Sequence, residues 1–492
     1  SSHFGSSSRL GPSSRNFQAI GVSTCVFKLG LGPDIKSMWR LVLFLGCAVT
    51  GAFAEIFQFN NLPMPETEKV KGYYVFHVVA DAVGTKVLDT SAASAAVTFK
   101  NFELKWSDGK VGIGNDQGIA VLLIPLRKLT EWVNKSYACD SGRPMATFNR
   151  EADNVCIFNP AKQKEVTVPI KATDAYLLTV ANCGKGTGAT LLKGQVTVKQ
   201  AHGYLPGNKV WSFHWWRWFT VVNAFLCVMW IVAAGRHRNA LMYVHAMITW
   251  LAFAALMEGA LSFFQHREWN NSGSQHRILV AAAMGFYGIK YAATLHLLME
   301  SASGSGFVIA TLAMSAQLKM NMVCVVFLLM QFIWKMIISY KDQYMITPRF
   351  IMAITVSDSL IWLVLFMWVY CKFNSLLVTL QDQKLGSEIV RLFLNVRLVL
   401  VGTFLLAAVV LLMQLADVWL AVTPWKLQWV PYDAAPHAVY TLFLLAVMIL
   451  WWPHADSRKL GYYDSVNQDE TEAGKEACRV VAEQVGAKVD EF

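Results

Sequence analysis

Apolar residues gather into seven long runs after residue 210. A helix needs about 20 apolar residues to cross the roughly 30 Å hydrocarbon core of a bilayer, and each run is close to that length. We therefore predict seven membrane-spanning helices in residues 209–453. The predicted spans are 212–234, 240–263, 278–299, 320–340, 350–372, 397–420 and 437–453.

Ahead of these runs, residues 55–208 show the short alternating pattern of β-strands. The predicted strands are Tyr73–Val79, Ala95–Leu104, Ile119–Leu126, Glu165–Ile170, Tyr176–Val180 and Gly194–Val198. Six or more short strands in about 150 residues favour an antiparallel sandwich. The predicted fold class is an all-α seven-transmembrane helix bundle preceded by a luminal all-β sandwich domain.

The N-terminal region has the pattern of a secretory signal. Met38-Trp39-Arg40 precedes a short apolar stretch, and Ala52-Phe53-Ala54 supplies small residues for cleavage before Glu55. We interpret residues 38–54 as a signal peptide and 1–37 as a disordered or non-native extension. A long natural leader is the alternative.

Cleavage of a signal peptide would place the β region in the lumen. Seven spans would then place the acidic tail, residues 454–492, in the cytosol. Arg236 and Arg238 in the first short loop agree with the positive-inside rule. So do the basic residues around the predicted third cytosolic loop, Lys372, Lys384, Arg391 and Arg397. Basic residues also occur on the luminal side, so the orientation depends mainly on the signal peptide.

Composition supports a membrane protein and argues against several other classes. The chain is 55% hydrophobic and only 15% charged, whereas soluble proteins carry about 25% charged residues. Its net charge of +10 is spread over loops without a basic stripe, so we expect membrane lipids and no nucleic acid as partners. The sequence has no GxSxG, HExxH or P-loop pattern, and we predict no enzyme activity.

Three cysteines fall in the predicted luminal segment, where disulfides can form. Cys139 and Cys156 flank a polar loop and are the favoured pair, while Cys183 could pair with either of them. Two sequons, at Asn134 and Asn270, predict glycosylation on the luminal side. Neither cysteine nor histidine spacing indicates a metal site.

Charged residues inside the predicted spans are the strongest functional signals, because burying one in hydrocarbon costs at least about 2.5–3.5 kcal/mol. Glu258, Lys290 and Asp358 fall deepest. They predict either an internal salt bridge or a polar cavity that opens to the lumen and takes a lipid headgroup, peptide or ion. Lys335 and Asp417 fall near span ends, where they could snorkel to the interface.

His296 and Glu300 lie one helical turn apart on the third predicted span. Such a pair could bind a metal, but it is more often part of a packed or solvated helix face. We therefore expect no metal and no cofactor, apart from a possible bound phospholipid.

Four motifs resemble a known family. The stretch from Tyr176 to Cys183, followed by Gly194 and His202-Gly203-Tyr204-Leu205-Pro206, resembles its last sandwich strands and its Gly-Tyr-Leu-Pro lead into the first helix. The other three are Met257-Glu258 with Phe263-Phe264, Lys290 with Gly304-Ser305-Gly306, and Trp451-Trp452-Pro453. Together they resemble the GOLD-domain seven-transmembrane proteins, also called the lung seven-transmembrane receptor family. Ser305 and Trp452 depart from that family's Gly-Tyr-Gly and Trp-Arg-Pro patterns, so the chain is a divergent member.

The resemblance implies a Golgi or endosomal multi-pass protein of vesicular trafficking, which binds a luminal protein cargo or a lipid. Two alternatives stay open. One is a G-protein-coupled receptor, although the third and seventh spans lack the rhodopsin-like Asp-Arg-Tyr and Asn-Pro-x-x-Tyr motifs. The other is a cation channel lined by Glu258 and Asp358.

Overall fold

The structure is a computed structural model of the 492-residue chain. It describes residues 56–63, 69–78, 95–106, 111–112, 119–125, 139–140, 143–144, 156–158, 165–170, 173–182, 189–305, 314–340, 348–382, 387–420 and 423–454. The predicted extension, the signal peptide, Asn134, Cys183 and the acidic tail beyond His454 lie outside these ranges.

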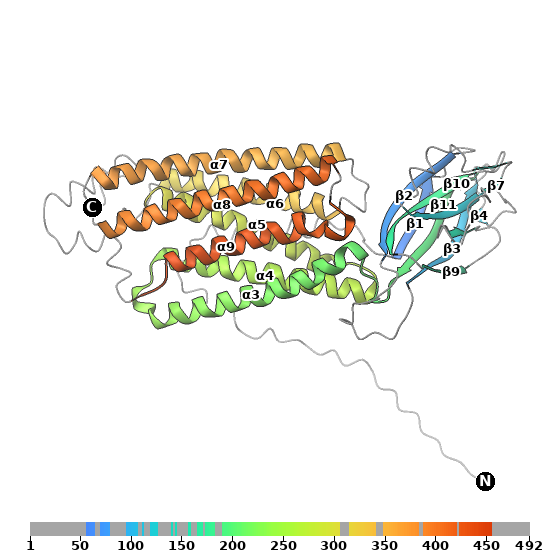
Figure 1. The fold of residues 1–492 in the computed structure, drawn as a ribbon, viewed down its shortest axis with the longest axis horizontal. Coiled ribbons are helices and arrows are strands. Elements are labelled where there is room, and N and C mark those ends of the chain that lie inside the picture. The colour runs from blue at the N-terminus through green and yellow to red at the C-terminus, as the bar shows by residue number, and fades with distance from the viewer. Residues whose placement is uncertain are drawn as a thin grey trace, which may run out of the picture. The chain divides into compact units, whose positions relative to one another are not determined.

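The region before the helices is built of antiparallel β-strands (Figure 1). One sheet has the order β1-β11-β3-β4, with β9 also paired to β3, and a second has the order β2-β10-β5-β8. The strands are β1 Ile56–Pro63, β2 Lys69–Val78, β3 Ala96–Trp106, β4 Val111–Gly112, β5 Ile119–Pro125, β8 Cys156–Phe158, β9 Glu165–Pro169, β10 Asp174–Asn182 and β11 Ala189–Lys199, with a hairpin of β6 Cys139–Asp140 and β7 Arg143–Pro144.

All six predicted strands are confirmed, as β2, β3, β5, β9, β10 and β11. The period-two pattern that predicted them matches their burial. In β3, Val97 and Phe99 are fully buried, while the alternating residues Thr98 and Lys100 are partly exposed. Alternate side chains of a strand point to opposite faces, so one face of this sheet is apolar.

Seven helices long and apolar enough to cross a membrane follow the β region. They are α3 Val210–Arg236, α4 Tyr243–Ser272, α5 Arg277–Ala302, α6 Met314–Tyr340, α7 Pro348–Asp382, α8 Ser387–Leu420 and α9 Ala435–Leu450, and the last is preceded by the short turns η5 Trp425–Leu427 and η6 Val430–Ala434. Figure 1 shows them side by side as one bundle. We call the end where α3 begins the proximal end and the end where α9 finishes the distal end.

The existence of all seven spans is confirmed, but several predicted boundaries are wrong. Helix α7 continues to Asp382 and α8 begins at Ser387. Arg391, which falls between the two predicted spans, therefore lies on α8. The last span begins at Trp425 instead of residue 437. The prediction began too late because Pro431 and Pro436 interrupt the apolar run, although they do not end the span.

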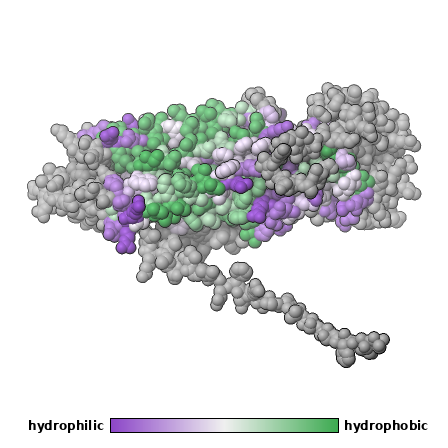
Figure 2. All heavy atoms as spheres, turned by 60° about the horizontal axis from the view of Figure 1, so that its bottom comes forward, coloured by the Kyte–Doolittle hydropathy of each residue, from purple (hydrophilic) through white to green (hydrophobic). Residues whose placement is uncertain are grey.

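The helices differ greatly in how much of their surface is covered. Helix α5 is the most buried, at 61% of its most apolar stretch, whereas α7 and α8 are each only 11% buried. Figure 2 shows apolar side chains covering the middle of the bundle, with polar residues gathered toward its two ends. This is the pattern expected of a lipid-facing surface, since lipid chains are as apolar as the side chains that they contact.

Candidate functional site

The centre of the bundle holds a buried ion pair between α4 and α5. Lys290 Nζ donates to Glu258 Oε2 at 2.5 Å, and the two side chains are 0% and 1% exposed. Each residue lies near the middle of its helix and therefore far from both ends of the bundle. Leaving either charge without a partner at this depth would cost several kcal/mol, so each residue requires the other.

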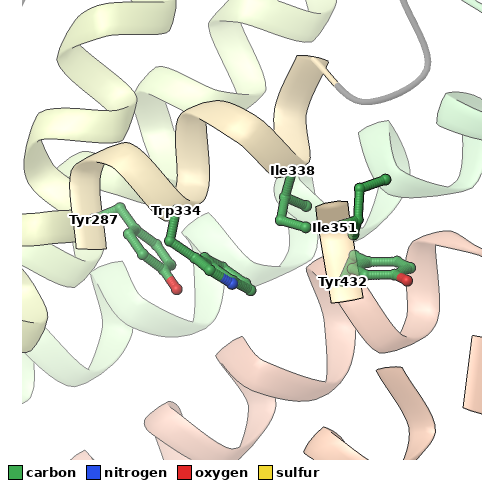
Figure 3. Packing of buried hydrophobic residues seen from close by; sticks show 5 residues of the cluster. All are labelled: Tyr287, Trp334, Ile338, Ile351 and Tyr432. Carbon is green, nitrogen blue, oxygen red and sulfur yellow. The ribbon is translucent and has the colours of Figure 1, made fainter. Parts of the chain in front are cut away.

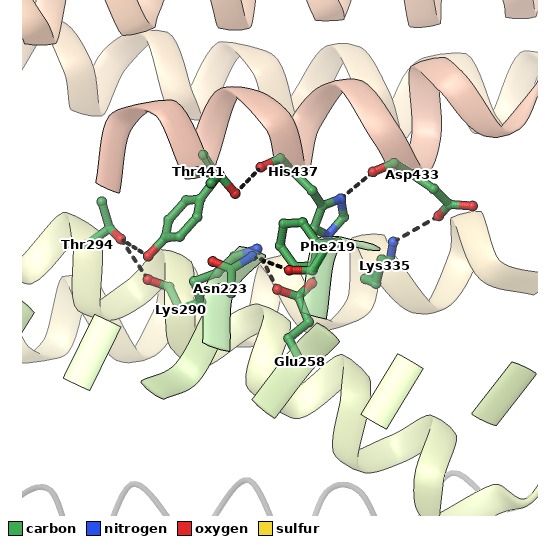
Figure 4. Close-up of polar contacts among 10 residues, drawn as sticks. Phe219, Asn223, Glu258, Lys290, Thr294, Lys335, Asp433, His437 and Thr441 are labelled. Carbon is green, nitrogen blue, oxygen red and sulfur yellow. Dashed lines mark hydrogen bonds and ion pairs between the residues drawn. The ribbon is translucent and has the colours of Figure 1, made fainter. Parts of the chain in front are cut away.

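A third residue, His437 of α9, completes this central triad. Its Nε2 lies 2.8 Å from Glu258 Oε1, and its Nδ1 donates to the Asp433 carbonyl at 2.5 Å (Figure 4). Since a carbonyl only accepts, Nδ1 carries a hydrogen. A hydrogen bond between Nε2 and Oε1 then requires a second hydrogen on one of these two atoms. The triad thereby joins α4, α5 and α9.

Three tyrosine rings surround the Lys290 ammonium. Its Nζ lies 4.4 Å from the ring centre of Tyr440, 4.7 Å from that of Tyr291 and 5.3 Å from that of Tyr287. A cation over an aromatic face is attracted by the ring quadrupole, and the attraction is stronger away from water. The rings thus replace part of the hydration that Lys290 loses.

A second ionic cluster lies about one helical turn nearer the proximal end, around Asp433. Its carboxylate accepts a hydrogen bond from Ser212 at 2.9 Å and lies 3.5 Å from the ammonium groups of both Lys209 and Lys335. Lys335 also lies over the ring of Tyr287. Lys335 therefore has an internal carboxylate as its partner, while its proposed position near the interface stays a prediction.

The local backbone explains why Asp433 and His437 face inward together. Val430–Ala434 forms a π-helical turn, and Pro431 and Pro436 flank Asp433. Proline lacks an N–H and disturbs the regular hydrogen-bond ladder, which favours such a bulge. Gln414 of α8 donates to the Pro431 carbonyl at 2.8 Å and so supports the turn from outside. Figure 3 shows Tyr432 of this turn beside Ile338 and Ile351.

Asp358, the third residue of the predicted cluster, is not brought to Lys290. It lies partly buried on α7, where its Oδ1 accepts a hydrogen bond from Gln331 of α6 at 2.7 Å. Lys290 has the other predicted partner, Glu258, and His437 is an additional member of the cluster. Asp417 is buried within the bundle, at 8% exposure.

The other predicted site residues have separate positions. Cys139 lies in β6 and Cys156 in β8, but their side chains, like Cys183, lie outside the described part of the chain, so the disulfide stays a prediction. Asn270 lies within the last turn of α4. Its carboxamide accepts from the Leu205 N–H at 3.2 Å and donates to the His202 carbonyl at 2.7 Å.

The His296–Glu300 pair lies buried toward the distal end. His296 Nε2 contacts Asn321 Oδ1 at 3.1 Å, and its Nδ1 lies 3.6 Å from Glu300. Among the described residues, no group of three potential ligands is close enough to hold a metal. The arrangement matches a packed polar contact between α5 and α6.

Sequence reasoning missed Asp433 and His437, because the predicted seventh span began only at residue 437. One signal was available. The stretch Val430–His437 contains two prolines, and it places an aspartate and a histidine four residues apart in an otherwise apolar helix. Residues four apart share a helix face, so both could be expected to point toward the same neighbours.

Comparison with known families agrees with the seven-helix architecture. The sequence model of the family described as GOST, seven transmembrane domain, matches residues 213–458, which is half of the chain and contains the whole central triad. No curated protein matches the chain. The predicted resemblance is thus confirmed: this protein is a multi-pass membrane protein that belongs to the GOST seven-transmembrane family.

Proposed function

We propose that this protein works in vesicular trafficking at the Golgi or endosomal membrane, where its β region recognises a luminal cargo and the helix bundle anchors it. The observation that carries this proposal is the closed centre of the bundle. Glu258, Lys290 and His437 satisfy one another and are at most 1% exposed. A core of this kind holds helices together, which leaves recognition to the region outside the membrane.

We take the β region to be the family's GOLD-like sandwich. Its two antiparallel sheets with apolar inner residues, such as Phe99 and Tyr176, support that assignment. The signal peptide over residues 38–54 would deliver this region to the lumen and the tail to the cytosol. The same closed centre gives no support to a cation pathway along Glu258, because Lys290 neutralises that carboxylate and would repel a passing cation.

The test is the steady-state location and the cargo of the full chain. We expect a tagged full-length protein to co-localise with Golgi or endosomal markers, and we expect its loss to change the set of secreted and surface proteins. A chimaera in which an unrelated folded domain replaces residues 56–200 should keep the location and fail to restore that set.

Residence at the plasma membrane, together with an unchanged secreted set, would contradict the proposal and favour a receptor.

One structural feature favours a receptor as the second candidate function. Helices α7 and α8 are the least covered of the seven, so this pair could move against the remaining five. Ligand-dependent G-protein activation by the full chain would establish a receptor.

A further inference from the structure

Two buried polar atoms face each other in the distal part of α5. They are His296 Nδ1 and Glu300 Oε2, which lie 3.6 Å apart, and neither has a hydrogen-bond partner among the described residues. The two side chains are only 16% and 10% exposed. A buried polar group without a partner is costly, and a hydrogen shared by these two atoms would remove the cost for both.

The contact with α6 decides which imidazole nitrogen carries a hydrogen. His296 Nε2 lies 3.1 Å from Asn321 Oδ1, and a carboxamide oxygen only accepts, so Nε2 is the donor. In a neutral imidazole, Nδ1 is then a bare acceptor. The oxygens of an ionised Glu300 are acceptors too, so two lone pairs would face each other. One added proton, on either atom, turns this repulsion into a hydrogen bond.

The other neighbours of the pair supply no compensating charge. Tyr243 of α4 and Cys324 of α6 are titratable side chains that interact with Glu300, and both are neutral in their ordinary form at neutral pH. No lysine or arginine among the described residues forms an ion pair with Glu300. Glu300 also lies in the last turn of α5, where the negative end of the helix dipole favours an added positive charge.

The distance between the two atoms suits a proton better than a larger ligand. A bridging water would make two hydrogen bonds of about 2.7–3.0 Å at an open angle, and this requires a gap wider than 3.6 Å. A metal ion would need further protein ligands, and no group of three is close enough within the described ranges.

We propose that His296 and Glu300 form a proton-binding site in the distal part of α5, separate from the central triad. The pair holds one proton at neutral pH, and this proton stabilises the contact of α5 with α6. Loss of the proton places two acceptors against each other, so the contact weakens as the pH rises. The site makes the packing of the distal part of the bundle sensitive to pH.

The test is thermal unfolding of the purified full chain in detergent between about pH 6 and pH 9, with a metal chelator and at constant ionic strength. In the unfolded chain, histidine loses its proton at about pH 6.5 and glutamate at about pH 4.3. Above pH 6.5 only the folded pair holds a proton, so its contribution to stability falls as the pH rises. One proton changes the unfolding equilibrium constant by at most about tenfold per pH unit.

Glu300→Gln replaces the proton with an amide that can donate to His296 Nδ1. We expect the Tm of the parent protein to fall relative to that of Glu300→Gln as the pH rises above 6.5. His296→Gln should lose the same pH dependence, because its amide can donate to Glu300 without an added proton. Glu268→Gln is the matched control, since Glu268 is exposed on α4, and it should keep the pH profile of the parent.

A Tm difference between the parent protein and Glu300→Gln that stays constant over this pH range would overturn the proposal. A second measurement replaces the chelator with Zn²⁺. A saturable rise in Tm that Glu300→Gln abolishes would also overturn it, since the pair would then be a metal site.

Discussion

The imidazole Nε2 of His437 lies 2.8 Å from Glu258 Oε1, although 179 positions separate the two residues in the chain. This contact joins α9 to α4 at the middle of the bundle. Lys290 holds the other oxygen of the same carboxylate. Glu258 is therefore the shared partner of two helices, and its two neighbours should not act independently.

Lys290→Met should lower the stability of the protein by about 3–5 kcal/mol, because it leaves the Glu258 carboxylate without its ammonium partner. The double variant Lys290→Met with Glu258→Gln should recover part of that loss, since it removes the uncompensated charge. Thermal unfolding in detergent measures both. Lys319→Met is the control, because Lys319 is exposed on α6. A Lys290→Met protein as stable as this control would show that the ion pair does not hold the bundle.

His437→Phe should destabilise the protein by about 1–3 kcal/mol through loss of its two hydrogen bonds. The ring contacts with Trp216 and Phe219 can persist, so the change isolates the polar contribution. In a double-mutant cycle with Glu258→Gln, the two effects should be strongly non-additive. His276→Phe, at an exposed position before α5, should have little effect. Additive losses would mean that His437 and Glu258 are not coupled.

Gly203→Ala should be strongly destabilising for the segment that leads into α3. Gly203 has a φ of +127°, and an added Cβ would lie 2.5 Å from the Asn270 carbonyl oxygen. The backbone conformation alone costs an L-residue roughly 1–3 kcal/mol. Gly235→Ala provides the contrast, because nothing lies within 4 Å of its added Cβ and its φ is ordinary. Limited proteolysis and Tm should separate the two variants, and equal behaviour would contradict the packing around Asn270.

The segment that leads into α3 should become less stable in acid. Burial, the largest cause, and the nearby His214 lower the pKa of His202 from its ordinary value of 6.5, against a hydrogen bond to the Leu205 carbonyl that raises it. The folded segment thus prefers neutral His202, while the unfolded segment takes up a proton near pH 6.5. The stabilisation is complete above that pH and declines as the pH falls below it.

The Tyr204 amide, which donates to the Asn270 carbonyl, should exchange its hydrogen faster at pH 5.5 than at pH 7.5 after correction for intrinsic rates, because the segment is less stable in acid. The Gly273 amide at the end of α4 is an internal reference. His202→Gln should remove the pH dependence. If exchange at the Tyr204 and Gly273 amides changed equally with pH, the predicted role of His202 would be wrong.

Asn134 should carry a glycan, and the mature chain should begin at Glu55, if the β region is luminal. Glycosidase treatment should shift the mobility of the parent protein but not of Asn134→Gln. Asn270 is the weaker acceptor, since it lies within α4 and its carboxamide is engaged on both sides. An unmodified Asn134, combined with a tail protected from cytosolic protease, would invert the orientation.

The kinds of element and their order could be predicted from the sequence. Seven apolar runs predicted the helices and six alternating stretches predicted six of the strands, because both patterns are local consequences of how side chains repeat along a helix or strand. The presence of Glu258 and Lys290 inside helices, and the need of each for a partner, could also be predicted. Glu258 lies at the middle of α4, however, only because that helix continues to Ser272, beyond the predicted end at residue 263.

Which buried charges become partners depends on how the helices pack. Hydropathy predicts that a segment forms an apolar helix, but it does not predict how that helix is rotated or which helix lies beside it. Lys290 could therefore have paired with Asp358 as readily as with Glu258. The inward position of His437 and Asp433 depends on the π-helical turn Val430–Ala434, which contains Pro431 and is followed by Pro436. This departure from regular geometry shifts the helix face. Hydrophobic attraction has no direction, so the choice of polar partners rests with the packing of α4, α5 and α9.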